Sequence, residues 1–249
     1  TAIPQQPAIR LRDVIVSEVT KIVTHPATLL AVSLAFAANT LFAIVAATDV
    51  VRFGASDGTS VPLSAFPTVM FAPVYAFLVL PVYAAASEYH DGQLRVSLTA
   101  VPHRHRLVIG KLAAAVGVVI PAALVALVPA RLILGLHEGL AVSALLADIG
   151  RWVGAYLLMS LFVFGLAAVL RSTIVPLVIL AVTVIGVNAG LVQWPEGVRF
   201  LPDQAAMSML GTPAFEVTEL PPVIGALALG LWALVAICGY AVALIRRDG

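Results

Sequence analysis

Long apolar runs separated by short polar stretches dominate the hydrophobicity pattern of this chain. A helix needs about 20 apolar residues to cross the hydrocarbon core of a bilayer. Six runs of suitable length lie at about residues 27–47, 68–86, 107–134, 152–170, 173–194 and 223–245. The pattern therefore predicts an all-α integral membrane protein, with six transmembrane helices in a single transmembrane domain over residues 1–249.

Residues 8–24 have a different pattern, in which apolar and polar side chains occupy opposite sides of a helix. The apolar side holds Leu11, Ile15, Val19 and Ile22, and the polar side holds Arg10, Asp13, Ser17, Lys21 and Thr24. Such a segment is typical of a helix that lies in the membrane interface. We expect an N-terminal amphipathic interfacial helix, separated from the first span by Pro26.

Composition agrees with a membrane protein. Charged residues make up 11% of the chain, against about a quarter in soluble domains, and the mean hydropathy is +1.05. The length leaves no room for an added catalytic domain, and the N-terminal stretch lacks the apolar core of a secretory signal. The one cysteine, Cys238, cannot form a disulfide within the chain, and no basic run with interleaved aromatic residues predicts nucleic-acid binding.

The distribution of charge predicts the orientation of the spans, because cytoplasmic loops are enriched in Lys and Arg. With the N-terminus inside, the cytoplasmic segments hold ten cations and five acids, and the outer segments hold four cations and eight acids. We therefore expect a multi-pass protein of a bacterial plasma membrane with both termini in the cytoplasm.

A polar segment from Ser87 to Lys111 interrupts the apolar runs in the predicted cytoplasm. Within it, Leu94, Ser97, Leu98 and Val101 have the i, i+3, i+4, i+7 spacing of one helix face. Gly92 permits a turn before this helix and Pro102 ends it. The pattern predicts a short cytoplasmic helix, which either docks in a groove on a soluble partner or rests on the membrane surface.

This segment also resembles a known family. The residues that carry the likeness are Ser87-Glu88-Tyr89, Gly92, Arg95, Ser97-Leu98, Val101-Pro102, Arg104, Arg106 and Lys111. They resemble the cytoplasmic loop of type-2 ABC transporter permeases of the actinobacterial kind. The wider layout is similar too, with Ser17-Glu18 and Lys21 before the first span, Phe200-Leu201-Pro202 before the sixth, and a terminal Arg246-Arg247.

The resemblance implies the membrane-spanning subunit of an ATP-driven exporter. Residues 87–106 would form a coupling loop whose short helix sits on an ATPase subunit. The implied ATPase-coupling residues are Glu88, Gly92, Leu94, Arg95, Leu98, Pro102, Arg104, Arg106 and Lys111. In this interpretation Arg95 pairs with acidic groups of the ATPase, and Glu88 holds Arg95 or Lys111. Two ATPase subunits and a second permease chain, identical or related, complete the expected assembly.

ATP is expected to bind to other chains. A phosphate-binding loop would read G-x-x-x-x-G-K-[ST], but Gly110-Lys111 is followed by Leu112 and lacks the preceding glycine loop. We therefore predict that this chain is not an enzyme and binds no cofactor, and that ATP and Mg²⁺ bind to the partner ATPase.

Polar residues inside the spans are the candidates for a substrate path, because each costs free energy unless it has a partner. The candidates are Asn39, Tyr75, Thr183 and Asn188. Hydrogen bonding to neighbouring helices is the alternative interpretation of each. Because these polar residues are few and uncharged, the path favours an amphipathic or hydrophobic substrate, such as an antibiotic, a peptide or a lipid.

The remaining features leave alternatives open. Arg131 lies inside an apolar run, where we expect it to reach outward to lipid headgroups rather than to pair with Glu138. His103 and His105 alternate with arginines, which disfavours zinc, so no metal site is predicted. Residues 195–222 form either short helices that cap the outer mouth or an idle connector. For the whole chain, the alternative functions are a passive channel or scaffold and an intramembrane enzyme.

Overall fold

The computed structural model describes residues 10–54, 60–87, 104–192 and 194–247. Its helices and strands are α1 (Leu11–Thr24), α2 (Pro26–Thr48), β1 (Arg52–Gly54), β2 (Ser60–Pro62), η1 (Leu63–Ala65), α3 (Pro67–Phe71), α4 (Pro73–Phe77), α5 (Val79–Ala86), α7 (Arg104–His137), α8 (Val142–Leu170), α9 (Val175–Asn188), α10 (Pro195–Val198), α11 (Pro202–Leu210), η3 (Glu216–Thr218) and α12 (Pro222–Arg247). The all-α prediction is confirmed, apart from a small antiparallel hairpin in which Phe53 pairs with Val61.

Five helical segments among the described residues are long and apolar enough to cross a membrane. They are Pro26–Thr48, Pro67–Ala86, His105–His137, Val142–Leu170 and Pro222–Leu244. They coincide with five of the six predicted spans, although α8 begins ten residues before the predicted span at 152. The chain is therefore a multi-pass membrane protein in its helical architecture.

The sixth predicted span, 173–194, forms a shorter helix. α9 has 14 residues, or about 21 Å at 1.5 Å per residue, whereas the hydrocarbon core is about 30 Å thick. It ends because Gly190 adopts a left-handed conformation (φ 69°) while Leu191 N–H bonds back to the Gly186 carbonyl. This Schellman turn stops the helix, and the prediction of six full-length spans is not confirmed.

Prolines shape the second span. Pro67 and Pro73 each occupy the first turn of a short helix, where their missing N–H is not needed. The span is therefore divided into α3, α4 and α5. Pro121 and Pro129 instead lie within the continuous helix α7. Proline therefore interrupts the helix in the second span but is accommodated in the third.

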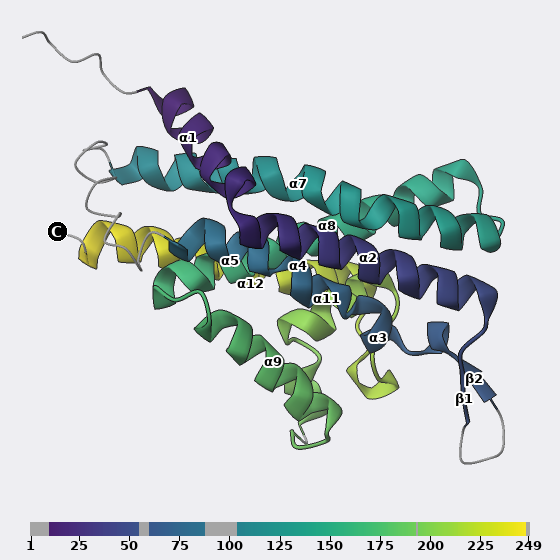
Figure 1. The fold of residues 1–249 in the computed structure, drawn as a ribbon. Coiled ribbons are helices and arrows are strands. Elements are labelled where there is room, and N and C mark those ends of the chain that lie inside the picture. The colour runs from purple at the N-terminus through teal and green to yellow at the C-terminus, as the bar shows by residue number, and fades with distance from the viewer. Residues whose placement is uncertain (1–9, 55–59, 88–103, 193, 248–249) are drawn as a thin grey trace, which may run out of the picture.

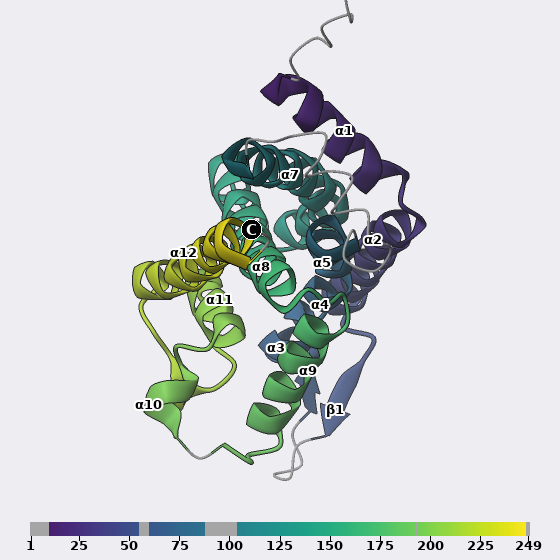
Figure 2. The same cartoon turned by 90° about the vertical axis from the view of Figure 1, so that its left-hand side faces the viewer.

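The bundle is built around α8, which makes its most extensive contacts with α12 and also packs against α7, α5 and α11. Aromatic rings fill this core, with Phe77 against Tyr156 and Phe164 against Tyr240. α8 and α12 approach closely at Gly165, where an added Cβ would lie 2.6 Å from the Ala236 carbonyl oxygen. In contrast, α9 diverges from the bundle (Figure 2).

The elements gather at two ends of the bundle. The C-terminus and the beginning of α7 lie at one end together with α1, and the β1–β2 hairpin lies at the opposite end with the end of α7 (Figure 1). Segments predicted to be cytoplasmic therefore share one end, as alternating spans require. The connection between α9 and α12 is helical, and α11 is almost entirely buried against α8 and α12.

Candidate functional site

The structure describes only three of the nine predicted coupling residues, Arg104, Arg106 and Lys111. Glu88, Gly92, Leu94, Arg95, Leu98 and Pro102 lie outside the described residues, as does most of the predicted coupling loop. Arg104 is the first residue of α7, and Arg106 is exposed just after it. Lys111 is different, because its side chain is only 5% exposed. The candidate site is therefore the described region around the end of α5 and the beginning of α7, the two helices that flank residues 88–103.

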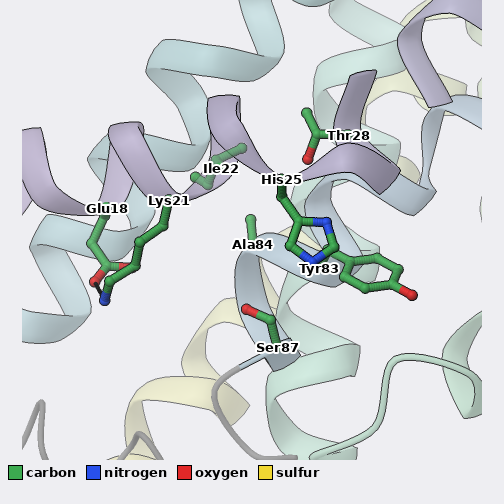
Figure 3. Close-up of a pocket in the computed structure, with 8 residues that line it drawn as sticks. All are labelled: Glu18, Lys21, Ile22, His25, Thr28, Tyr83, Ala84 and Ser87. Carbon is green, nitrogen blue, oxygen red and sulfur yellow. Dashed lines mark hydrogen bonds and ion pairs between the residues drawn. The ribbon is translucent and has the colours of Figure 1, made fainter. Parts of the chain in front are cut away.

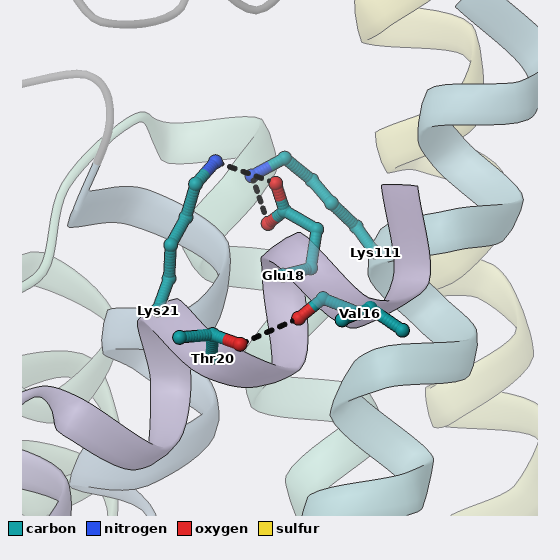
Figure 4. A network of polar contacts seen from close by, with 5 residues as sticks. All are labelled: Val16, Glu18, Thr20, Lys21 and Lys111. Carbon is teal, nitrogen blue, oxygen red and sulfur yellow. Dashed lines mark hydrogen bonds and ion pairs between the residues drawn. The ribbon is translucent and has the colours of Figure 1, made fainter. Parts of the chain in front are cut away.

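An ion cluster at this end joins α1 to α7 (Figure 4). The Lys111 ammonium lies 3.1 Å from Glu18 Oε2, and the Lys21 ammonium lies 2.6 Å from Glu18 Oε1. Glu18 is as buried as Lys111, whereas the Lys21 side chain is 44% exposed. A buried carboxylate is tolerated when cations satisfy its oxygens, so these two lysines permit Glu18 to face the bundle.

Close packing brings the cluster together. A Cβ on Gly110 would lie 2.7 Å from Cγ1 of Val14, so glycine at this position lets α1 approach the α7 backbone. Val14, Glu18 and Ile22 follow at four-residue spacing and are all buried. The tight contact at Val14 therefore brings Glu18, one turn later, within reach of the lysine that follows Gly110.

The helix predicted at residues 8–24 forms as α1, and Ile15, Val19 and Ile22 of its predicted apolar face pack against the core. Leu11 is 37% exposed, and the buried row is shifted to the side of Val14 and Glu18. The resemblance implied that Glu88 holds Arg95 or Lys111, and Glu88 lies outside the described residues. Sequence reasoning did not identify Glu18 as a partner of Lys111. The sequence signal that could have identified Glu18 is its spacing. It lies four residues after Val14 and four before Ile22, so all three share one helix face.

A small polar recess adjoins the ion cluster (Figure 3). Its lining residues come from the end of α1, the start of α2 and the end of α5, and they are Glu18, Lys21, Ile22, His25, Thr28, Tyr83, Ala84 and Ser87. The His25 ring lies 4.7 Å from the Tyr83 ring. Ser87 is the last described residue before position 88, so the recess adjoins the end of α5 that precedes most of the predicted coupling loop.

Three of the four substrate-path candidates make hydrogen bonds within the bundle. Asn39 is buried and donates hydrogen bonds to Tyr156 Oη (3.1 Å) and to the Ala35 carbonyl (2.8 Å), which joins α2 to α8. Thr183 and Asn188 each donate to a carbonyl of their own helix. Asn39 therefore agrees with the alternative interpretation, hydrogen bonding to a neighbouring helix, whereas Thr183 and Asn188 bond within α9.

Tyr75 is the candidate that faces a cavity. It lines an apolar cleft of about 340 Å³ between α4 and α9, together with Leu177, Leu180, Ala181, Val184 and Ile185. Its hydroxyl is buried and makes no hydrogen bond with the described residues. A polar group at the wall of an apolar cleft suits an amphipathic ligand better than an ion.

Charges at the opposite end correct the expectation for Arg131. Its Nε lies 2.6 Å from Asp148 Oδ2 on α8, and both side chains are 15% exposed. Its guanidinium also lies 4.8 Å from the centre of the Trp152 ring. Arg131 thus pairs with a carboxylate on the next helix, Asp148, rather than with Glu138 or the headgroups, and the Trp152 ring lies against its guanidinium.

A buried carboxyl lies in the connection before α12. Asp203 is 1% exposed in the first turn of α11 and accepts a hydrogen bond from Gln204 Nε2 at 2.9 Å. Burial raises the pKa of the Asp203 carboxyl above its ordinary value, and hydrogen bonds from Gln204 and from the backbone partly oppose that rise. Sequence patterns did not indicate this burial, because Asp203 lies in a polar, proline-rich connection.

Comparison of the chain with models of known protein families and with curated proteins found no match. The likeness to type-2 ABC permeases therefore remains a prediction that rests on the loop residues and the span layout.

Proposed function

We propose that this chain is the permease subunit of an ATP-driven ABC exporter. The observation that carries the proposal is the buried Glu18–Lys111 ion pair near the beginning of α7, the helix that follows residues 88–103. The sequence of the loop 88–103 resembles a coupling segment, and one flank, α7, is joined to α1 by this pair. A displacement of this loop by a soluble subunit would move α7, and the ion pair would carry α1 with it.

The proposed assembly contains two ATPase subunits, which bind ATP and Mg²⁺, and a second permease chain, identical or related. Both termini and the loop 88–103 face the cytoplasm of a bacterial cell in this proposal, as the excess of cations there favours. Arg95 and Leu98 supply the main contacts with the ATPase, through charge and through an apolar face respectively.

The proposed substrate is amphipathic or hydrophobic, in the class of antibiotics, peptides and lipids. The apolar cleft beside Tyr75 supports this, because its other lining residues are aliphatic. A sugar or an ion would require several polar partners in the same cavity.

Coupling can be tested with the chain and a co-purified ATPase reconstituted in vesicles. We expect the double variant Arg95→Ala with Leu98→Ala to uncouple ATP hydrolysis from transport while the chain still inserts. The matched control is Arg52→Ala, an exposed arginine on the β1–β2 hairpin at the other end of the bundle. Unchanged transport in the double variant contradicts the proposal, and conduction without ATP favours a passive channel instead.

A further inference from the structure

An apolar cleft lies where α9 diverges from the bundle (Figure 2). Its volume is about 340 Å³, and five aliphatic side chains of α9 line it together with Tyr75 of α4. Among its described lining residues, only Tyr75 carries a polar side-chain group. The cleft therefore offers an apolar ligand a single hydrogen-bonding group.

The Tyr75 hydroxyl lacks a hydrogen-bond partner in the described part of the chain. It is shielded from solvent and unbonded, whereas the buried hydroxyl of Tyr156 on α8 is bonded to Asn39 at 3.1 Å. A buried hydroxyl without a hydrogen bond destabilises the fold. A ligand that forms a hydrogen bond with Tyr75 would remove this cost, so the hydroxyl is suited to recognition rather than to holding helices together.

The carboxyl of Asp203 determines which ligand group suits this hydroxyl. Asp203 is close enough for its charge to act on Tyr75. A hydroxyl in the field of a carboxylate turns its hydrogen toward the negative charge, which leaves its lone pairs to accept a hydrogen bond. Tyr75 is therefore oriented to accept from a donor such as an ammonium group.

Asp203 is buried without a cation beside it. Its hydrogen bonds come from the Gln204 side chain and from backbone N–H groups, and no ion pair joins it to a cation within the described ranges. Arg199, the cation nearest to it in the sequence, lies against the Phe200 ring instead, 5.3 Å from the ring centre. Buried carboxylates are usually paired with a cation, so a cationic ligand group would balance this charge.

We propose that the cleft binds an amphipathic amine in its cationic form. The ammonium group donates a hydrogen bond to Tyr75 Oη and lies in the field of Asp203, and the apolar part of the amine lies against the aliphatic side chains of α9. A carboxylate or a phosphate would instead be repelled by Asp203. The inference narrows the proposed substrate class to cations, and it rests on the proposed function only in naming the bound amine a substrate.

The experiment measures binding of radiolabelled dodecylamine to the purified chain in a neutral detergent by equilibrium dialysis, with protein-free micelles as the background. Unlabelled dodecylamine, dodecanol and dodecanoic acid, which have the same chain length, compete for the site. We expect dodecanol to compete about tenfold more weakly than dodecylamine, the effect of about one charge-assisted hydrogen bond, and dodecanoate to compete more weakly still. Equal competition by the amine and the alcohol overturns the proposal.

Ala181→Phe tests the apolar part of the site, because it adds a ring where a methyl group lines the cleft. This variant should lower the affinity for dodecylamine about tenfold or more. Val182→Phe is the matched control on the same helix. Val182 is 64% exposed and does not line the cleft, so this variant should bind as the wild type does. Wild-type affinity in Ala181→Phe contradicts the proposed location.

Two conservative variants test the polar part. Tyr75→Phe removes only the hydroxyl and should weaken dodecylamine binding several-fold, whereas Tyr83→Phe, which alters the polar recess instead, should not. Asp203→Asn should reduce the preference for dodecylamine over dodecanol to less than about twofold, and Asp49→Asn, at an exposed position, should keep it. Tyr75→Phe and Asp203→Asn should both fold, because they remove an unsatisfied hydroxyl and a buried charge. A full preference in Asp203→Asn overturns the proposal.

Binding is measured without ATP or an ATPase subunit, so it is separable from transport. A chain that binds the amine but does not transport it in the reconstituted vesicles supports this inference and contradicts the proposed function. A chain that transports amphiphiles but shows no preference for amines contradicts this inference alone.

Discussion

Glu18 on the N-terminal helix and Lys111 on α7 lie 93 positions apart in the sequence, yet their charged atoms approach to 3.1 Å and both side chains are 95% buried. Removing one partner from a buried ion pair leaves the other charge in a medium that solvates it poorly. The pair therefore fixes the position of α1 on the bundle more strongly than an exposed ion pair could.

Glu18→Gln should lower the free energy of unfolding by about 3 kcal/mol, because two lysines lose a shared carboxylate and one of them is buried. Thermal unfolding in detergent measures this loss. Lys21→Gln is the internal control and should cost less than about 1 kcal/mol, because the Lys21 side chain is partly solvated. Equal effects of the two substitutions would show that the burial of Lys111 does not matter.

Asp148→Asn should destabilise the protein by about 2 kcal/mol. The substitution removes the charge opposite Arg131 in a site that is mostly shielded from water. Glu138→Gln should be neutral within about 0.5 kcal/mol, because Glu138 is exposed and exposed substitutions rarely change stability by more. The midpoints of thermal unfolding of the two variants distinguish the Arg131–Asp148 pair from an Arg131–Glu138 pair. A larger loss of stability in Glu138→Gln than in Asp148→Asn would refute the Arg131–Asp148 pair.

Gly165→Ala should destabilise the α8–α12 contact by about 1–3 kcal/mol, because the new methyl group would overlap the backbone of Ala236. Gly150→Ala is matched to it on the same helix, with open space where the methyl group would lie. That control should be neutral or stabilising by up to about 1 kcal/mol, since alanine favours a helix more than glycine does. Thermal unfolding of the two variants in the same detergent measures this difference. Equal stability of Gly165→Ala and Gly150→Ala would contradict a close α8–α12 contact at Gly165.

The pH dependence of stability should reflect Asp203. Because burial raises the pKa of this carboxyl in the folded state, ionisation opposes folding. The stabilising contribution of the protonated form is complete below the ordinary value of 3.8 and is lost as pH rises through the raised pKa. Asp203→Asn should therefore match the wild type near pH 4 and exceed its stability near neutral pH. An unchanged pH profile in Asp203→Asn contradicts this assignment, and Asp49→Asn, at an exposed position, serves as the control.

Orientation can be measured with single cysteines in a Cys238→Ala background. Arg106→Cys and Glu196→Cys place exposed thiols at α7 and α10, in segments predicted to lie on opposite sides of the membrane. A membrane-impermeant maleimide should label Glu196→Cys on intact cells and Arg106→Cys only after permeabilisation, since the excess of cations around Arg106 favours the cytoplasm. The reverse labelling would invert the proposed topology.

The sequence by itself determined where the membrane-spanning helices lie, because a bilayer requires long apolar segments with internally satisfied backbones. Five predicted spans are helices long enough to cross, and residues 8–24 contain α1. The sixth span was less predictable, since residues 173–194 are apolar throughout while a local turn at Gly190 stops the helix at Asn188. Hydrophobicity indicates whether a segment lies in lipid or in water, but it does not indicate where the helix ends.

Only the tertiary structure decided which charges and hydroxyls meet. Arg131 was expected to reach the headgroups rather than to pair with Glu138, whereas in the fold it meets Asp148. The fold also brings Lys111 to Glu18, while the role that the resemblance implies for Glu88, which lies outside the described residues, stays a prediction. Likewise, no pattern distinguished Thr28 from Thr20, although only Thr28 of the two lines a groove. These partners depend on how closely helices approach and how they are rotated, and both follow from contacts such as Gly110 with Val14 that join distant parts of the chain.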